Sequence, residues 1–320
     1  LVVLEQIDIS QLSNKEEKAK HAVLLSMALD KNYIDKTDFE VLQPAIDYYE
    51  DNGSSTDKLR TYYYQGRIYQ NAGNDTSAME YFVNALSEGS QSNDVLTKAR
   101  IHFAQSNIYY DLYDFDNFIE SNKSAALYFK QAEEYDSYAF CLIRIINGYT
   151  LKDEHDKALP YIEECKLMLD GLNITILTDF YSSYITYLIR YGTEQEIDEI
   201  IHQYIDSIPS PNIDWLTIAN AYYAMYRYNE ALSILSQYDT EGNEYKEKKY
   251  LAILYEVYKS LGDHKNALEI FEEYVDIFST NIFAKMQQDT KFVEERYNLE
   301  MAKAKEAEAK NKRTITVWAC

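Results

Sequence analysis

Adjacent carboxylates are the most frequent candidates for acid–base chemistry in this sequence. Glu133 is followed by Glu134, and Glu163 is followed by Glu164. Adjacent acids on a helix usually form a solvated surface. No nucleophile-elbow, zinc-protease, Walker or dinucleotide glycine motif accompanies them. The sequence therefore offers no nucleophile, base or phosphate cradle, and we expect no catalytic residues and no enzymatic activity.

The histidines and cysteines show no pattern typical of a metal site or a disulfide scaffold. Cys141, Cys165 and Cys320 form neither a C-x-x-C pair nor a dense, even spacing. We expect Cys141 and Cys165 to be buried free thiols, although both fall on the paired helices of one expected repeat and could lie close. We expect no metal or other cofactor, because the histidines are scattered: His21, His102, His155, His202 and His264.

Tyrosine is the residue type best suited to a binding surface here. The sequence contains 32 tyrosines, some in runs such as Tyr62-Tyr63-Tyr64 and Tyr222-Tyr223. Neighbours on a helix point about 100° apart, so the members of a run cannot all face one core. Some must face a groove, a loop or water, where tyrosine offers rigid amphipathic contact area. Stacking on a carbohydrate is one use of such a surface.

The charge balance excludes one large class of partners. The formal net charge is −22 at pH 7, whereas nucleic-acid binding needs clustered Lys and Arg to neutralise phosphates. We therefore expect no nucleic-acid partner for the folded body. A solvated acidic surface explains the charge, and a basic partner is the alternative.

The spacing of helix-breaking residues indicates an array of helices. The 320 residues include only 9 Gly and 4 Pro, and long stretches run without a turn cluster. A chain of this length forms either two domains or an elongated array whose core grows by stacking. The scarcity of turns favours the array.

An internal repeat supports this interpretation. The clearest copy has a large residue, a small residue four positions later and an aromatic three further, then a turn and a second helix with Ala, aromatic and Ala. This pattern resembles the tetratricopeptide repeat, which implies an all-α solenoid of helix-turn-helix units in a right-handed superhelix. Its landmarks are Tyr62, Gly66, Tyr69, Ala78, Phe82 and Ala85. We expect the small residues Gly66 and Ala78 to lie where the two helices cross.

The position of Gly66 recurs along the chain. Its equivalents are Ser106, Ile146, Ile185, Ala219 and Tyr255. The copies at Ser106, Ile146 and Ile185 are degenerate. Phe118 stands where Ala is usual in the second copy, and Ile185 with Ile197 replaces both small residues of the fourth. Residues 16–31 and 38–50 have helical apolar spacing and are predicted to form a further pair at the N-terminus.

These observations predict four segments. Residues 1–56 form the N-terminal pair or capping repeat, and residues 57–280 form the repeat array. Residues 281–313 form a long polar helix, as a cap or a coiled-coil stalk. Residues 314–320 are an apolar run too short to span a bilayer, which takes about 20 residues; they form either the start of a membrane helix or a tail.

In the tetratricopeptide family the first helix of each repeat lines a concave groove, chiefly through its second, fifth, ninth and twelfth positions. The resemblance thus implies groove positions for Arg60, Tyr63, Arg67 and Gln70 in the first repeat, for Arg100, Phe103, Asn107 and Tyr110 in the second, for Phe140, Ile143, Asn147 and Thr150 in the third, and for Ile213, Leu216, Asn220 and Tyr223 in the fifth.

The ninth position carries the most specific prediction. Asn107, Asn147 and Asn220 all occupy it, which resembles the asparagine ladders of peptide-binding tetratricopeptide proteins. An amide has both a donor and an acceptor, so such a ladder can pair with the backbone of an extended peptide. The first, fourth and sixth repeats break the ladder. Guanidinium groups could add a carboxylate clamp, for which the candidates are Arg67, Arg100 and Arg144. Solvation of the face or bonds to neighbouring helices are the alternative.

The two chain ends bear on location. The sequence begins at Leu1 without Met, so we expect that an upstream segment has been removed, and an export signal is one explanation. The array followed by a polar helix and an apolar run looks like the bacterial envelope tetratricopeptide proteins with a C-terminal membrane helix. That resemblance implies an extracytoplasmic location, whereas the Lys and Arg residues before residue 314 favour a cytoplasmic one.

Four functions follow. The leading hypothesis is a non-catalytic scaffold or sensor that binds a protein or peptide segment in its groove, attached to the membrane. The others are a cytoplasmic peptide-responsive regulator, a carbohydrate-binding envelope protein and, least supported, an enzyme on an unfamiliar scaffold. The sequence leaves the oligomeric state open.

Overall fold

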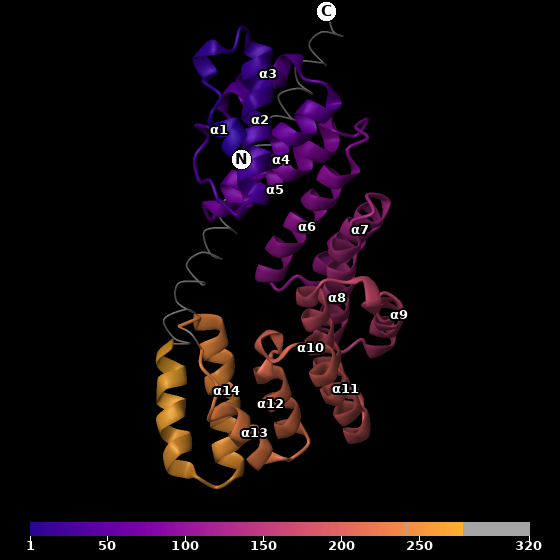
Figure 1. Ribbon diagram of the computed structural model, residues 1–320, viewed down its shortest axis with the longest axis vertical. Helices are drawn as coiled ribbons and strands as arrows, with labels where there is room; N and C mark the ends of the chain where they lie inside the picture. The colour runs from indigo at the N-terminus through magenta and orange to yellow at the C-terminus, as the bar shows by residue number, and fades with distance from the viewer. Residues whose placement is uncertain (241, 278–320) are drawn as a thin grey trace, which may run out of the picture. The chain divides into compact units, whose positions relative to one another are not determined.

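The structure is a computed structural model that describes residues 1–240 and 242–277. All regular secondary structure within these ranges is helical (Figure 1). The predicted polar helix at 281–313 and the apolar run at 314–320 lie outside the described residues. None of the helices in the described ranges has the length and apolar character needed to cross a membrane.

The chain divides into two compact units, within residues 1–97 and within residues 98–277 of the described part, and each is treated by itself. Unit 1 begins with α1 (Val2–Glu5) and a short 3-10 turn at Ile9–Gln11. Its helix pairs are α2 (Lys15–Lys31) with α3 (Gln43–Asn52), and α4 (Ser55–Asn71) with α5 (Asp75–Glu88).

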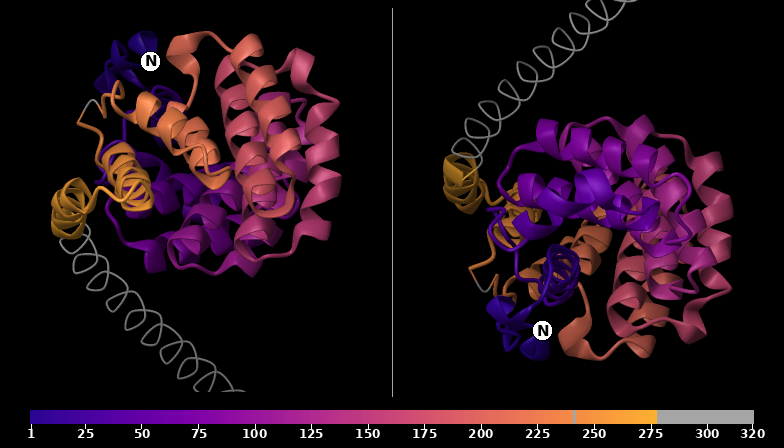
Figure 2. Two further views of the ribbon diagram at one scale, coloured as in Figure 1. Left: turned by 90° about the horizontal axis from the view of Figure 1, so that it is seen from below. Right: turned by 90° about the horizontal axis from the view of Figure 1, so that it is seen from above.

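Unit 2 contains the remaining pairs, and helix α6 (Val95–Asp111) starts just before its boundary. The pairs are α6 with α7 (Phe115–Gln131), α8 (Tyr135–Leu151) with α9 (His155–Lys166), α10 (Ile174–Tyr191) with α11 (Glu194–Ser207), α12 (Trp215–Ala224) with α13 (Tyr228–Leu235), and α14 (Glu244–Ser260) with helical residues 264–277. The helices of unit 2 follow one another around a curve (Figure 2).

The predicted crossing at Gly66 is confirmed. A Cβ atom on Gly66 would lie 2.5 Å from the Phe82 ring and 3.2 Å from the Ala78 carbonyl oxygen, so only the missing side chain lets α4 and α5 approach this closely. In the next pair Ser106 and Phe118 occupy the corresponding positions, and both are buried. The degenerate repeat therefore keeps its crossing with a larger residue on the second helix.

The turns inside the pairs share one backbone geometry, except the turn between α10 and α11, where Gly192 has φ −96°. A residue with positive φ follows the first helix at Gly73 (φ 74°), Tyr113 (φ 55°) and Gly262 (φ 78°). The N–H group of the next residue then donates to the carbonyl of the motif tyrosine five residues earlier, as in Asn74 to Tyr69 at 2.9 Å. This is the Schellman arrangement, which satisfies the last carbonyls of the helix. Tyr33, Asp153 and Tyr226 have the same positive φ.

One predicted boundary is wrong. The second helix of the N-terminal pair begins at Gln43 rather than at residue 38. Pro44 explains the later start, because proline lacks an N–H group and suits the first turn of a helix. Before it, the Asp38 carboxylate accepts a 3.0 Å hydrogen bond from the Glu40 N–H group, which stabilises a turn instead.

The two cysteines of the α8–α9 pair are buried free thiols, as predicted. Cys141 lies on α8 and Cys165 lies on α9. Burial raises the pKa of each thiol to about 12. Cys320 lies outside the described residues.

Candidate ligand-binding face

The first helices of the pairs in unit 2 form a continuous row, which we call the first-helix row: α6, α8, α10, α12 and α14. Helix α8 packs against α10, α10 against α12, and α12 against α14. The rings of Phe103 on α6 and Phe140 on α8 are 5.8 Å apart, which extends the row to α6. The second helices α7, α9 and α11 lie along one side of the first helices α6, α8 and α10 (Figure 1).

The side chains of the three predicted ladder asparagines make no hydrogen bonds within the described part of the chain. Asn107, Asn147 and Asn220 lie on α6, α8 and α12, and each is partly exposed. In the described part of the chain none of their amides makes a hydrogen bond. Other asparagines in this chain are used differently, since Asn74 and Asn173 accept N–H groups at helix starts. The donors and acceptors of the ladder amides are therefore available to a ligand.

In the other two repeats of unit 2, the side chain at the ninth position makes hydrogen bonds within the protein. Thr186 on α10 donates a 2.8 Å hydrogen bond to the Ser182 carbonyl. Glu256 on α14 accepts from the Tyr223 hydroxyl at 3.3 Å and pairs with Lys259 at 3.4 Å. Tyr223, which the resemblance placed in the groove, thus has its hydroxyl bound to a neighbouring helix.

The three predicted site residues in unit 1 are engaged in the packing of that unit. Tyr63 is 4% exposed and its ring lies 4.8 Å from that of Tyr64, so it belongs to the core rather than to a surface. Arg67 donates from Nε to Asp30 at 3.3 Å and from Nη1 to the Gln70 side chain at 2.6 Å. Their positions on α4 match the family pattern, but their interactions are internal.

Arg144 is enclosed by aromatic rings instead of facing a clamp site. Its Cζ atom lies 4.9 Å from the ring centroids of both Phe103 and Phe118. Its Nε donates to Asn122 Oδ1 at 3.1 Å and its Nη2 donates to Ser106 Oγ at 3.2 Å. No acidic side chain pairs with it in the described ranges. Burial lowers its pKa, and the guanidinium binds α8 to α6 and α7 through cation–π contacts and hydrogen bonds.

Of the three arginines considered for a carboxylate clamp, Arg100 alone keeps its guanidinium uncommitted. Arg100 lies on α6, is partly exposed, and makes no ion pair or hydrogen bond among the described residues. On the same helix Tyr110 is 46% exposed, and its ring packs 5.3 Å from that of Phe118. Burial and the nearby Tyr245 on α14 raise the pKa of Tyr110. Arg100, Asn107 and Tyr110 thus form the available part of α6.

Counting the second motif position through every repeat identifies two charged residues that the sequence analysis missed. These are Asp179 on α10, six residues before Ile185, and Lys249 on α14, six residues before Tyr255. Both residues can be found from the repeat spacing alone, because each lies at the position of Arg60 in the clearest repeat. In the fifth repeat Ile213 precedes α12 and is buried.

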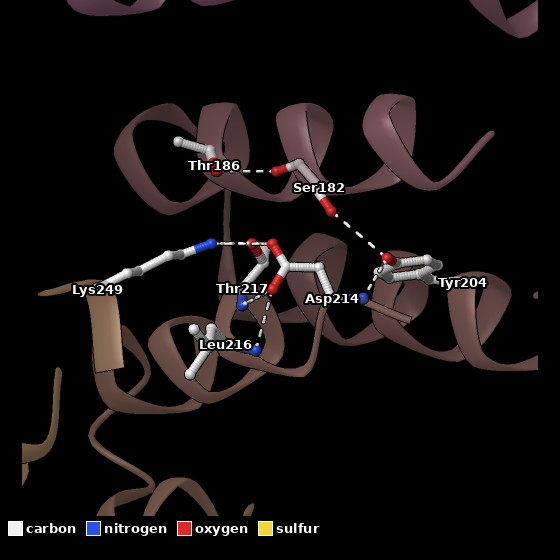
Figure 3. A network of polar contacts seen from close by, with 7 residues as sticks. All are labelled: Ser182, Thr186, Tyr204, Asp214, Leu216, Thr217 and Lys249. Atoms are coloured by element: carbon white, nitrogen blue, oxygen red, sulfur yellow. Dashed lines mark hydrogen bonds and ion pairs between the residues drawn. The ribbon is translucent and has the colours of Figure 1, made fainter. Parts of the chain in front are cut away.

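Lys249 belongs to a closed polar network (Figure 3). Its Nζ atom lies 2.9 Å from Asp214 Oδ2 and 2.8 Å from Thr217 Oγ1. Asp214 also accepts from the Thr217 hydroxyl at 2.6 Å and from the Leu216 N–H group at 3.1 Å. Burial opposes the charge of Asp214, but Lys249 and these donors hold the pKa of the carboxyl below its usual range. Helix α14 is thereby fixed to the start of α12.

Asp179 lies beside this network without joining it. It is one turn before Ser182, whose hydroxyl lies 3.4 Å from the Tyr204 hydroxyl, and Tyr204 accepts the Asp214 N–H group at 2.7 Å. Asp179 itself is partly exposed and has no hydrogen bond or ion pair within the described chain. Burial and the neighbouring Asp214 carboxylate raise its pKa to about 6. It is therefore an uncompensated acid on the first-helix row.

A cavity of about 390 Å³ lies next to the same network. It opens where the first turns of α12 and α14 meet the loop before α12. Its lining is mixed in charge and polarity and includes Thr178, Asn212, Asp214, Tyr238, Tyr245 and Lys249. A cavity of this size holds a side chain or a small polar group rather than a folded domain.

Comparison with known proteins identifies the fold. No family model matches the sequence, and no curated protein matches it. The crystal structure of NprR in complex with its cognate peptide NprX matches with a TM-score of 0.52 and 16% identity, over 92% of this chain and 89% of that chain. A Rap protein complexed with competence and sporulation factor gives 0.48 and 14%, over 91% and 72%. At such identities the likeness shows the fold alone. The described chain is an all-α solenoid of tetratricopeptide type.

Proposed function

We propose that this chain is a non-catalytic binding protein that holds a linear peptide segment along the first-helix row of unit 2. One observation carries the proposal. Asn107, Asn147 and Asn220 occupy the same motif position on three first helices, and their amides are partly exposed and make no internal hydrogen bond. Buried or half-buried polar groups normally find partners, so three unused amides in register indicate a ligand with repeating donors and acceptors.

An extended peptide backbone has that chemistry. Each of its residues offers one N–H donor and one carbonyl acceptor, and an asparagine side chain can pair with both without reading the peptide sequence. The solved NprR complex contains a peptide, which supports the same ligand class for this chain. Selectivity would then come from side chains beside the ladder, such as Tyr110 and Phe140.

The source of the ligand depends on the location of the protein, for which the sequence offers an extracytoplasmic and a cytoplasmic alternative. A peptide sensor on the outer side of the cell envelope would bind secreted or degraded protein segments. A cytoplasmic regulator would bind peptides made in the cell or imported into it. Fractionation of native cells, with the chain detected by antibody, separates the two.

The test uses pools of random octapeptides and affinity selection with mass spectrometry. Wild-type protein is compared with an Asn107→Ala, Asn147→Ala, Asn220→Ala variant. Each amide contributes about 1 kcal/mol of binding free energy, so the triple variant should bind selected peptides about 100-fold more weakly. A matched variant, Asn84→Ala with Asn229→Ala, changes asparagines on second helices and should bind normally.

Circular dichroism checks that both variants remain helical. If wild-type protein selects no peptide at millimolar concentration, or if the ladder variant selects the same peptides as the matched variant, peptide binding by these amides is excluded.

A further inference from the structure

We infer that the first-helix row takes a peptide of defined direction, with an anionic group, typically a free carboxylate, at Arg100 and a cationic side chain at Asp179. This inference rests on the proposed function, because it assigns the chemistry and orientation of a ligand for the same row. The proposed ligand is a linear peptide that carries both charges, and it is not a folded protein.

The contrast with other charged residues at these motif positions is the first argument. Arg60 pairs with Asp94 at 2.6 Å, Arg67 pairs with Asp30 at 3.3 Å, and Lys249 pairs with Asp214 at 2.9 Å. Arg100 and Asp179 have no such partner among the described residues. Partial burial of an uncompensated charge costs free energy, and a ligand group of opposite charge recovers it.

The surroundings of each residue determine which ligand charge it favours. Asp214 is the acid whose charge acts on Asp179, and that charge is already matched by Lys249, Thr217 and a backbone N–H group. Asp179 therefore remains the carboxylate that can accept a cation. On α8, Arg144 already donates to Asn122 and Ser106. Arg100 on α6 is therefore the guanidinium that can donate to a ligand carboxylate, in the bidentate geometry that arginine favours.

The spacing of the two charges fixes the length of the peptide between them. Arg100 lies on α6 and Asp179 on α10, with α8 between them. Neighbouring packed helices have axes about 8–10 Å apart, so the two positions are about 16–20 Å apart along the row. An extended chain rises about 3.3 Å per residue, so this distance corresponds to about five or six residues.

The segment between the charges passes an apolar side chain. Phe140 occupies the second motif position on α8, between Arg100 and Asp179 in the row, and is partly exposed. A phenyl ring there favours an apolar or aromatic side chain near the middle of the peptide. From its N-terminal to its C-terminal end, the expected peptide has a basic side chain at Asp179, an apolar side chain near Phe140 and a free carboxylate at Arg100.

The experiment uses N-acetylated octapeptide pools in which one Lys is placed at each position in turn, with neutral residues elsewhere. Each pool is made with a free C-terminal carboxylate and as an amide. Wild-type protein should favour pools with Lys about five or six residues before a free carboxylate, by about tenfold over other pools. Acetylation removes the N-terminal amine, so the cation is the Lys side chain.

Single variants separate the two ends. Asp179→Asn should remove the preference for Lys position and keep the preference for a free carboxylate. Arg100→Gln should do the reverse. Asp206→Asn, which removes an exposed acid on α11, is the matched control and should leave both preferences unchanged.

The outcomes distinguish this inference from the function on which it rests. Capture that depends on Asn107, Asn147 and Asn220 but shows no Lys-position preference overturns the charge assignment and leaves peptide binding standing. A Lys preference that survives Asp179→Asn also overturns the assignment. Failure of wild-type protein to capture any pool overturns both.

Discussion

Arg144 and Asn122 are joined by a 3.1 Å hydrogen bond from Nε to Oδ1, which ties α8 to a completely buried amide on α7. Asn122 uses its own Nδ2 group to donate to the Phe118 carbonyl at 2.8 Å. Asn122 Oδ1 also lies 3.4 Å from the Ser106 hydroxyl, so Arg144 provides the shorter of its two hydrogen bonds. A charged residue in this position has a structural function in joining two repeats.

Replacement of Arg144 by methionine should destabilise the protein. The Arg144→Met variant keeps the length of the side chain but removes the cation–π contacts and leaves Asn122 Oδ1 without its guanidinium donor, at a cost of about 2–4 kcal/mol in the free energy of unfolding. Urea denaturation followed by circular dichroism measures this. Arg100→Met is the matched control and should cost less than about 0.5 kcal/mol. Equal losses in the two variants would contradict the structural function of Arg144.

The close approach at Gly66 should not tolerate a side chain. In Gly66→Ala the new Cβ atom would meet the Phe82 ring, and the expected loss is about 1–3 kcal/mol, after any gain in helix propensity. Gly171→Ala is the control, because no atom lies within 4 Å of the added Cβ there. Thermal unfolding of both variants provides the comparison, and a Gly66→Ala variant as stable as wild type would show that α4 and α5 separate easily.

Asp179 makes stability depend on pH. Its folded-state pKa is about 6, above the ordinary value of 3.8, so the folded state binds the proton more tightly than the unfolded state. The contribution of Asp179 to stability should therefore fall as pH rises from about 4 to about 6.5. Asp179→Asn removes this loss and should stabilise the protein by about 1 kcal/mol at pH 8, and hardly at all at pH 4, after allowance for solvent screening.

The charged group that acts on Asp179 is the carboxylate of Asp214, the N-cap residue of α12. The pKa of the Asp214 carboxyl is lowered, and wild type and Asp179→Asn share every other titratable group. A stability difference between them that changes from pH 4 to pH 6.5 therefore reports the titration of Asp179. Denaturation midpoints measured from pH 4 to pH 8 test this, and a stability difference independent of pH would contradict it.

Replacement of Glu133 by glycine should stabilise the protein. It lies between α7 and α8 with φ 58°, a conformation that costs an L-residue about 1 kcal/mol. Because glycine adopts it freely, Glu133→Gly should stabilise the protein by about 0.5–1 kcal/mol. Glu134→Gly is the control, because Glu134 has φ −87° and should gain nothing. Differential scanning calorimetry reports both, and the proposal fails if the two variants shift Tm equally.

The helix-pair architecture could be predicted from the sequence because repeat landmarks are core residues. The spacing of Gly66, Ala78 and Phe82 reflects the close crossing of α4 and α5 that the structure shows, and the equivalent positions can be followed through the later copies even where the residue types change. The start of α3 was missed because periodic apolar residues continue upstream of Pro44, and the periodicity was given more weight than the proline. The left-handed turns at Tyr113 and Tyr226 were also missed, since only glycine signals such a turn in a sequence.

The candidate site could be predicted only in part, because position in the repeat does not fix side-chain partners. Asn107, Asn147 and Asn220 stay uncommitted. Tyr63 and Arg144 occur in the same motif, but Tyr63 packs against Phe82 of α5 and Arg144 bonds to Asn122 of α7. Those contacts depend on three-dimensional packing between segments many residues apart, as with Asn122 and Arg144. No spacing rule within one repeat contains that information.

The buried sulfur atoms of Cys141 and Cys165 can report how often the α8–α9 pair opens. With pKa values of about 12, they form almost no thiolate at neutral pH, and the thiolate is the species that alkylating agents attack. Their labelling rate therefore follows the frequency with which α8 and α9 separate. In a chain with Cys320 replaced by serine, that rate would report whether a bound peptide slows local unfolding next to the asparagine ladder.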